Sequence, residues 1–246
     1  MSEVRNHRSF SGLTAVVLAG GLGTRLRTVV IDRPKVLATV AGRPFLTYLL
    51  NQLAAAGVTD VVLCTGYLAD QVRETYGDTY RSMRLSYSLE KSPRGTAGAL
   101  RHALPLIHSD EILVMNGDSF CDVDLQNFYA HHVESEALAS ICLTGAEDSS
   151  RFGRVILGSD SRIIRFEEKS DCRGPGLINA GIYCLATCLL NSIPPMQRVS
   201  LEREVFPKLI GQKFYGYCET ERTFIDIGTP ESYQKAEELF SQGAYA

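Results

Sequence analysis

The stretch AVVLAGGLGTRLRTVVIDRPK, residues 15–35, decides how the rest of the chain is interpreted. The apolar run 13–18, which overlaps its start, predicts a buried β-strand. A glycine-rich segment, 19–24, follows at once, and glycine lets backbone N–H groups turn toward a ligand that approaches closely. Four cations come next, Arg25, Arg27, Arg33 and Lys35. Open amides followed by cations favour a triphosphate site at the end of a strand.

Two well-known phosphate motifs are absent from this loop. The P-loop pattern GxxxxGK[ST] needs a lysine followed by serine or threonine after the second glycine, and the loop has none. The dinucleotide pattern GxGxxG needs a glycine three residues after Gly23, where the chain has Leu26. The loop therefore predicts neither a P-loop nor an ordinary NAD site.

Size and composition indicate one large globular domain. The chain has 246 residues, a net charge of −3 and 45% hydrophobic residues, which argues against a general nucleic-acid binder. No apolar run approaches about 20 residues, so no membrane span is expected. The polar, basic first residues lack the features of a signal peptide. Seven scattered cysteines are expected to be buried thiols in a reducing compartment, which predicts a cytoplasmic protein.

Hydrophobic periodicity predicts alternating strands and helices in the first half of the chain. The expected strands are 13–18, 58–65, 83–88 (an exposed or edge strand), 111–115 and 137–143, and the expected helices are 44–56, 68–76 and 97–104. This alternation predicts an α/β fold with a Rossmann-like mixed, mainly parallel sheet flanked by helices.

Shorter strands dominate after residue 147, which suggests a small lobe for a second substrate. The expected strands are 154–157 and 163–167 (a hairpin), 178–185, 214–218 and 223–227. A last helix is expected after Thr229, with Pro230 in its first turn.

Two aspartates lie at or near the ends of predicted strands, and open parallel sheets bind ligands at the carboxyl ends of their strands. Asp118 ends the segment Asn116-Gly117-Asp118, and Asp226 lies in the segment 224–230. Either residue could simply cap a helix or turn. Beside a phosphate loop, however, Asp118 is better placed to bind Mg²⁺, because this ion needs a carboxylate next to the phosphates.

These segments together resemble the sugar-1-phosphate nucleotidyltransferases. The matching motifs, in the order of the family, are 20–26 with 33–35, 116–118, 167–169, 178–183 and 226–230, and the match extends from about Leu13 to Phe240. Within the family the chain is most similar to the D-glycero-D-manno-heptose 1-phosphate guanylyltransferases and the mannose-1-phosphate guanylyltransferases. Its short length and segments 166–169, 176–179 and 224–228 are closer to the heptose branch.

The resemblance implies a domain division and a set of site residues. A flexible leader is expected over 1–12 and a single nucleotidyltransferase domain over 13–246, with a nucleotide-binding half (about 13–146) and a sugar-phosphate-binding half (about 147–246). The implied catalytic residues are Arg25, Lys35 and Asp118, and the implied Mg²⁺ ligands are Asp118 and Asp226. The nucleotide-binding residues would be Leu18, Ala19, Gly20, Gly21, Gly23, Thr24, Glu90, Gly95, Thr96, Asn116 and Gly117. The sugar-phosphate-binding residues would be Gly153, Glu168, Lys169 and Asn179.

The implied chemistry needs no general base. The phosphate of a sugar 1-phosphate is already an anion, so alignment and charge neutralisation suffice for its attack on the α-phosphorus of a nucleoside triphosphate. Arg25 would face the leaving pyrophosphate, and Lys35 the α-phosphate or the sugar phosphate. Four of the five histidines, His102, His108, His131 and His132, are expected at the surface.

Glu90 bears on the choice of base. A carboxylate only accepts hydrogen bonds, and guanine presents two adjacent donors, whereas uracil and thymine present one donor between two acceptors. GTP is therefore favoured over UTP, although some uridylyl-transferring relatives also carry an acid nearby. The alternative is that Glu90 is a solvent-facing residue at a strand end.

The prediction is thus a guanylyltransferase that converts GTP and D-glycero-α-D-manno-heptose 1-phosphate into GDP-heptose for capsule, lipopolysaccharide or other surface-glycan synthesis. The alternatives are a mannose-1-phosphate guanylyltransferase, a uridylyltransferase acting on another sugar 1-phosphate, and, from a different class, a non-catalytic sugar-nucleotide-binding regulatory subunit. The expected partners are the two substrates, without nucleic acid or membrane, and a homodimer is left open.

Overall fold

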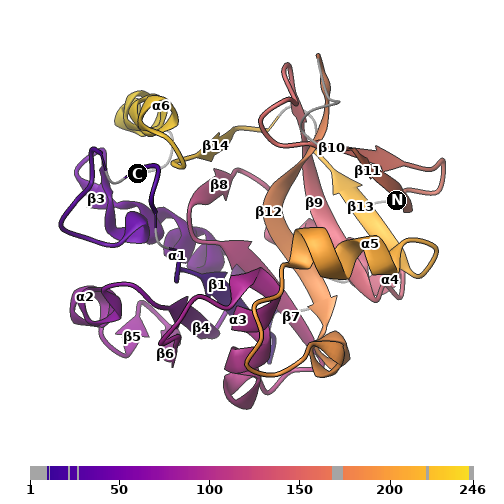
Figure 1. Cartoon of the computed structure of the whole chain (residues 1–246), viewed down its shortest axis with the longest axis horizontal. Helices are drawn as coiled ribbons and strands as arrows, with labels where there is room; N and C mark the ends of the chain where they lie inside the picture. Colours follow the sequence, from indigo (N-terminus) through magenta and orange to yellow (C-terminus); the bar gives the residue numbers. More distant parts are fainter. Residues whose placement is uncertain are drawn as a thin grey trace, which may run out of the picture.

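An eight-stranded sheet runs through the centre of the molecule, with helices on both of its faces (Figure 1). The computed structural model describes residues 10, 12–21, 23–26, 28–167, 174–219 and 222–243. Its strands are β1 (Thr14–Leu18), β2 (Thr39–Val40), β3 (Arg43–Pro44), β4 (Asp60–Thr65), β5 (Thr79–Tyr80), β6 (Met83–Leu89), β7 (Glu111–Asn116), β8 (Ser119–Cys121), β9 (Ala139–Ala146), β10 (Arg154–Leu157), β11 (Ile163–Glu167), β12 (Gly176–Ala186), β13 (Phe214–Cys218) and β14 (Phe224–Asp226). Its helices are α1 (Phe45–Ala56), α2 (Ala69–Tyr76), α3 (Gly95–Ala103), α4 (Leu125–Glu134), α5 (Phe206–Leu209) and α6 (Pro230–Ser241).

The strand order of the large sheet is β13-β9-β12-β7-β1-β4-β6-β5. Strand β1 lies between β7 and β4 and is parallel to both, β4 is parallel to β6, and β9 is parallel to β13. Strand β12 is antiparallel to its two neighbours, β7 and β9. The predicted mixed, mainly parallel sheet is confirmed. Strand β6 was predicted to be an exposed or edge strand. It is not at the edge, because the short strand β5 pairs with its outer side, but Arg84 and Leu89 on it are exposed.

The sheet separates two hydrophobic cores, and the alternation of side chains along each strand supplies both. In β1, Ala15 and Val17 belong to the core beneath α1, α2, α4 and α6, whereas Val16 belongs to the core beneath α3 and α5. All three residues are fully buried. A strand that is apolar at every position is therefore required here, which is why the continuous run 13–18 marks the centre of the sheet.

Residues from both predicted halves of the chain build this sheet. Strands β12 and β13 pair within it, while β10 and β11 form a separate antiparallel hairpin and β14 pairs with β8. Of the predicted leader, Phe10 and Gly12 are described, and Phe10 is buried with its ring centroid 5.3 Å from that of Tyr129.

None of the helices in the described part of the chain has the length and apolar character needed to span a bilayer.

The glycine and threonine signals in the sequence predicted the end of α1 and the start of α6 correctly. Gly57 ends α1 with φ of 88° in the left-handed region, as expected, whereas Pro44 precedes the helix instead of lying in its first turn. Thr229 caps α6 by accepting from the Ser232 amide, and Pro230 is the first helical residue, as predicted.

Helix α4 was missed, and with it the environment of His132. Asp124 caps this helix by accepting hydrogen bonds from the amides of Gln126 and Asn127. The expectation that His132 is at the surface is wrong, because its side chain is 0% exposed and shares a hydrogen bond of 2.9 Å with the Ser140 hydroxyl. The expectation of buried thiols is also wrong for Cys188 and Cys218, which are exposed.

Burial of His132 makes stability depend on pH. Loss of solvation lowers its pKa from 6.5 to about 4, although the Glu111 carboxylate is 3.8 Å from Nε2. Below pH 6.5 His132 is protonated in the unfolded chain but stays neutral in the folded protein. The free energy of unfolding therefore falls as the pH falls toward 4. We expect the free energy of unfolding, measured with urea, to lose about 2 kcal/mol more between pH 7 and pH 5 in the wild type than in His132→Leu. Equal losses in the two proteins would contradict this assignment.

Candidate active site

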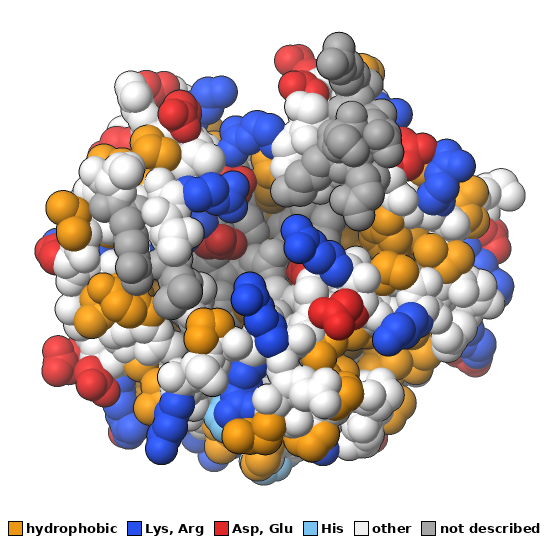
Figure 2. Space-filling view, in the orientation of Figure 1, with side chains coloured by type: hydrophobic (Ala, Val, Ile, Leu, Met, Phe, Trp, Pro, Cys, Tyr) orange, Lys and Arg blue, Asp and Glu red, His pale blue; other side chains and the backbone are white. Residues whose placement is uncertain are grey.

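A cavity of about 450 Å³ opens at the carboxyl ends of β1 and β7. Figure 2 shows Lys and Arg side chains gathered around the hollowed centre of this face. All of the predicted nucleotide-binding residues except Gly117 line the cavity: Leu18, Ala19, Gly20, Gly21, Gly23, Thr24, Glu90, Gly95, Thr96 and Asn116. Lys35 and Asp118 line it as well. The structure therefore brings together loops that are up to about a hundred residues apart in the sequence.

Backbone contacts at the strand ends hold this arrangement. Leu18 is in register with Asn116 on one side and with Cys64 on the other. The Gly117 amide donates to the Leu18 carbonyl at 3.0 Å, and the Ala19 amide donates to the Cys64 carbonyl at 2.8 Å. A Cβ on Gly117 would lie 2.7 Å from the Leu18 oxygen, so only glycine fits this crossing. Gly117 thus supports the cavity from behind and does not line it.

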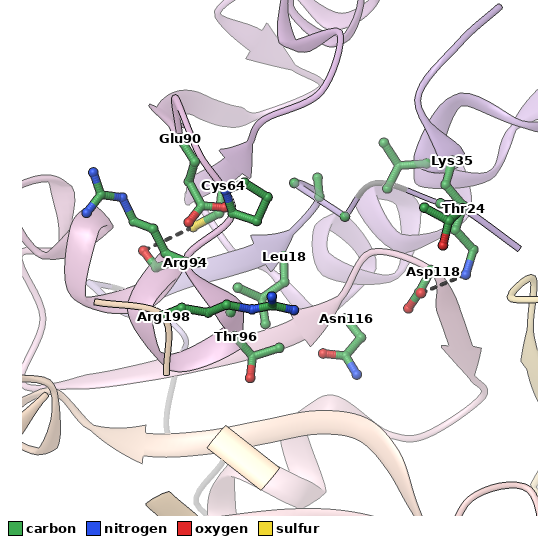
Figure 3. A pocket seen from close by; sticks show the side chains of 18 residues that line it. Leu18, Thr24, Lys35, Cys64, Glu90, Arg94, Thr96, Asn116, Asp118 and Arg198 are labelled. Atoms are coloured by element: carbon green, nitrogen blue, oxygen red, sulfur yellow. Dashed lines mark hydrogen bonds and ion pairs between the residues drawn. The ribbon is translucent and has the colours of Figure 1, made fainter. Parts of the chain in front are cut away.

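One end of the cavity is formed by Glu90, next to Cys64 and Arg94 (Figure 3). Glu90 is only 9% exposed, and its Oε1 is buried without a hydrogen-bond partner among the described residues. Burial raises its pKa, although the backbone N–H and the charge of Arg94 counteract part of this effect. A solvent-facing Glu90 is therefore ruled out. An unpaired buried carboxylate oxygen is costly, and it is available to a ligand that donates hydrogen bonds.

Gly20 makes room for this carboxylate. A Cβ on Gly20 would lie 2.8 Å from Glu90 Oε2, whereas a Cβ on Gly21 would meet nothing within 4 Å. A side chain at position 20 would therefore displace the Glu90 carboxylate from its present place. Gly21 leaves the backbone open toward the cavity.

The other end of the cavity is formed by Lys35 and Asp118, whose Nζ and Oδ2 atoms are 2.7 Å apart (Figure 3). The Asp226 carboxylate is nearby, since its two oxygens and Lys35 Nζ all lie within 3.6 Å of the point where a Cβ on Gly228 would stand. Asp226 also forms an ion pair of 3.5 Å with Arg151. Two carboxylates and two cations thus share this end of the site.

The remaining predicted residues lie away from the cavity or outside the described residues. Arg25 is exposed and is not part of the lining. Gly153 adopts φ of 80° in the turn before β10 and donates to the Ser149 carbonyl. Asn179, on β12, donates through Nδ2 to the Tyr183 hydroxyl at 3.0 Å. Glu168 and Lys169 lie outside the described residues, so their roles stay predictions.

Several lining residues were not found from the sequence: Val36, Cys64, Pro93, Arg94, Ala99 and Arg198. Arg198 reaches the cavity because its neighbour Val199 packs against the start of α3, where its carbonyl accepts from the amides of Ala97 (3.0 Å) and Gly98 (3.2 Å). This contact joins positions a hundred residues apart and leaves no local signal. Arg94 precedes α3 directly and could have been suspected from the adjacent Gly95-Thr96.

The family comparison covers almost the whole chain. The model of the family described as nucleotidyl transferase matches residues 14–243. D-glycero-alpha-D-manno-heptose 1-phosphate guanylyltransferase of Aneurinibacillus thermoaerophilus is 34% identical over 92% of this chain and 97% of its own length. Mannose-1-phosphate guanylyltransferase of Mycobacterium tuberculosis is 36% identical over 89% of this chain, which spans only 62% of that longer protein.

A solved structure agrees with these relatives. HddC from Yersinia pseudotuberculosis, in a crystal structure complexed with GMP-PN, superimposes with a TM-score of 0.82 at 32% identity. The match covers 93% of this chain and 99% of that one. The fold, including the strands that form the cavity, is thus shared with that protein.

The packing of Val199 against α3 predicts a difference between two glycines. Gly95 and Gly57 both have positive φ, but a Cβ at position 95 would lie 2.5 Å from the Val199 carbonyl oxygen and one at position 57 would meet nothing. We expect Gly57→Ala to cost about 1 kcal/mol of unfolding free energy through backbone strain alone. Gly95→Ala should cost about 1–3 kcal/mol more, because it adds the clash. Urea unfolding measures both, and similar costs would contradict the close packing described here.

Proposed function

Because the chain belongs to the nucleotidyl transferase family, we propose that it transfers a guanylyl group from GTP to a sugar 1-phosphate and releases pyrophosphate. The preferred acceptor is D-glycero-α-D-manno-heptose 1-phosphate, and mannose 1-phosphate is the alternative. The first is supported by a relative of nearly the same length, whereas the mannose-specific relative is considerably longer.

The observation that carries the proposal is the buried carboxylate of Glu90, with one oxygen unpartnered among the described residues. Guanine has two adjacent donors, N1–H and the exocyclic amine, and both can pair with one carboxylate. Uracil can offer only one donor to it. The end formed by Lys35 and Asp118 would then receive the phosphates, with Lys35 and a bound Mg²⁺ to neutralise their charge. A guanine nucleotide needs an acceptor for its base at one end and groups that neutralise its phosphates at the other.

Asp118 and Asp226 are the residues that would hold Mg²⁺. No group of three or more His, Cys, Asp or Glu side chains arranged for metal binding occurs in the described part of the chain. Two carboxylates suit Mg²⁺, however, because this ion commonly takes one or two carboxylates and completes its shell with substrate phosphates and water. When bound, the ion would neutralise charge on the phosphates and help to align them.

The residues of the chain then do the work of alignment and charge neutralisation. Lys35, held at Asp118, would bind the α-phosphate, and Gly20 and Gly21, which line the same cavity, would offer their amides to the phosphates. The acceptor phosphate attacks the α-phosphorus in line, a new P–O bond forms, and the bond to pyrophosphate breaks. Arg25 is assigned to the departing pyrophosphate. No proton needs to be removed from the nucleophile, so a general base is not required.

The sugar end is assigned to Gly153, Glu168, Lys169 and Asn179. Asn179 is next to Tyr183 on β12, which borders β7 and hence the Asn116 side of the cavity. A homodimer, a cytoplasmic location and a surface-glycan pathway stay predictions.

The base assignment is tested by a substrate panel with a Glu90 variant. Purified wild-type protein is assayed for pyrophosphate release with GTP or UTP, each combined with heptose 1-phosphate or mannose 1-phosphate and Mg²⁺. We expect turnover with GTP, and a loss of about tenfold in the GTP-to-UTP ratio of kcat/KM in Glu90→Gln, because an amide replaces a charged acceptor. Glu74→Gln, an exposed change of the same kind on α2, is the control and should leave the ratio unchanged.

An unchanged ratio in Glu90→Gln would refute the role of Glu90 in base selection. Absence of pyrophosphate release with every substrate pair would refute the enzyme itself. It would instead favour the other class, a sugar-nucleotide-binding regulatory subunit.

The role of Asp118 is tested separately. Asp118→Asn should lower kcat by about 10²–10³, because Asp118, which is both a proposed metal ligand and the partner of Lys35, loses its charge. It should also abolish the tightening of GTP binding by Mg²⁺ in calorimetric titrations, while the melting temperature stays close to that of the wild type. Asp70→Asn, at an exposed position on α2, is the matched control. Mg²⁺-dependent GTP binding that survives in Asp118→Asn would contradict the metal role.

A further inference from the structure

The carboxylate of Glu202 is the centre of a hydrogen-bond network behind the cavity. Glu202 lies in the π-helical turn Leu201–Val205, which precedes α5. It accepts from the hydroxyls of Thr96 (2.8 Å), Ser200 (2.7 Å) and Tyr183 (3.2 Å). Three donors on one carboxylate hold it firmly, since hydrogen bonds to a charged group are the strong ones.

This carboxylate fixes the direction of the bonds beyond it. A carboxylate can only accept, so the single hydrogen of the Tyr183 hydroxyl must point to Glu202. Tyr183 is fully buried, and burial and the Glu202 charge raise its pKa far above the ordinary value, so the hydrogen is retained. The hydroxyl oxygen can therefore only accept, from Asn179 Nδ2 at 3.0 Å and from Asn116 Nδ2 at 3.5 Å.

The Tyr183 hydroxyl consequently fixes the orientation of both asparagine amides. Each turns its NH₂ group toward Tyr183, which leaves its oxygen for other donors. Asn179 Oδ1 accepts from the Gly181 amide at 2.8 Å and retains a second lone pair. Asn116 Oδ1 is buried and has no partner among the described residues. Such an acceptor is costly to leave unpaired, so it points to a donor on a bound ligand.

Asn116 lies between the two ends of the cavity. Figure 3 shows it between Thr96 and Asp118, with Glu90 at the far end. The ribose of a nucleotide that spans the cavity from Glu90 to Asp118 would lie here, and its hydroxyls are hydrogen-bond donors. The Thr96 hydroxyl has less need of such a donor, because it already donates to Glu202 and accepts from the Leu201 amide at 2.8 Å, whereas Asn116 Oδ1 has no partner among the described residues.

We infer that Glu202, acting through Tyr183, is a positioning residue that sets the orientation of the Asn116 and Asn179 amides. Asn116 then presents its oxygen to a ribose hydroxyl of the nucleotide, and Asn179 presents its oxygen to a hydroxyl of the sugar. The inference rests on the proposed function, which supplies the two ligands. It joins the nucleotide side and the sugar side of the site through one carboxylate that touches neither substrate.

The test uses Glu202→Gln, Tyr183→Phe, the double variant, and Glu204→Gln as control. Glu204 is exposed, lies in the same turn and accepts from the Ser200 amide instead of from Tyr183. A glutamine at position 202 can donate as well as accept, so the direction of the bonds is no longer fixed. We expect the KM for GTP and for the sugar 1-phosphate to rise about five- to tenfold in each single variant. Glu204→Gln should stay within about twofold of the wild type, as surface changes usually do.

Two further readouts distinguish positioning from a loss of folded protein. The preference for GTP over 2′,3′-dideoxy-GTP, which lacks both ribose hydroxyls, should fall about tenfold in Glu202→Gln, and this ratio does not depend on the active fraction. The double variant should be no worse than Tyr183→Phe alone, because both changes act through the same two amides. Unchanged KM values with an unchanged dideoxy ratio would overturn the inference. Fully additive effects would overturn it as well.

Failure of the proposed function gives a different pattern. If the wild-type protein releases no pyrophosphate with any substrate pair, the guanylyltransferase assignment is wrong. The orientation of the amides is then decided in the unliganded protein, from the side-chain NH₂ resonances of Asn116 and Asn179. Both should shift in Glu202→Gln and in Tyr183→Phe, and neither should shift in Glu204→Gln. Resonances that stay in place in all variants would overturn the positioning role.

Discussion

The site depends on the hydrogen bond between the Gly117 amide and the Leu18 carbonyl, where the chain leaves β7 and crosses the end of β1. This crossing allows no side chain at position 117, because a Cβ there would lie 2.7 Å from the Leu18 oxygen. It sets the glycine loop after β1 beside Asn116 and Asp118, so one backbone contact brings together the nucleotide loop and a predicted metal ligand. The parallel pairing of β1 with β7 makes the meeting possible, since both strands end at the same edge of the sheet.

The two ends of the cavity differ in their polar groups, which explains how one site could hold both a base and phosphates. The Glu90 end is closed and acceptor-rich, and its carboxylate stays charged only at a desolvation cost that a donor-bearing ligand would reduce. At the opposite end, the charges of Lys35 and Asp118 are matched at 2.7 Å, and Asp226 is matched by Arg151. Between these ends, the Glu202–Tyr183 pair is inferred to fix the orientation of the Asn116 and Asn179 amides. In the proposed mode of binding, the groups that receive substrate are thus oriented before it arrives, which would lower the cost of binding.

Much of the fold and part of the site could be predicted from the sequence, because the information is local there. The run 13–18, the glycines after it and the acid at Asp118 are contiguous signals, and they fall around one cavity as expected. Arg198 and Glu202 gave no such signal, since tertiary packing alone brings them to the start of α3. His132 was misjudged for a related reason: polarity suggested the surface, whereas the packing of α4 on the sheet buries it. Antiparallel β12 was likewise invisible, because direction is not encoded in apolar alternation.

The proposed function requires that the cavity binds GTP with its base at Glu90 and its phosphates at Lys35 and Asp118. A crystal structure of the protein with a non-hydrolysable GTP analogue and Mg²⁺ tests it most directly. We expect guanine N1 and the exocyclic amine within about 3.2 Å of the Glu90 carboxylate, with the α-phosphate beside Lys35 and the ion on Asp118 and Asp226. A base placed at the Lys35–Asp118 end, or a Glu90 carboxylate that pairs with no part of the nucleotide, would contradict it.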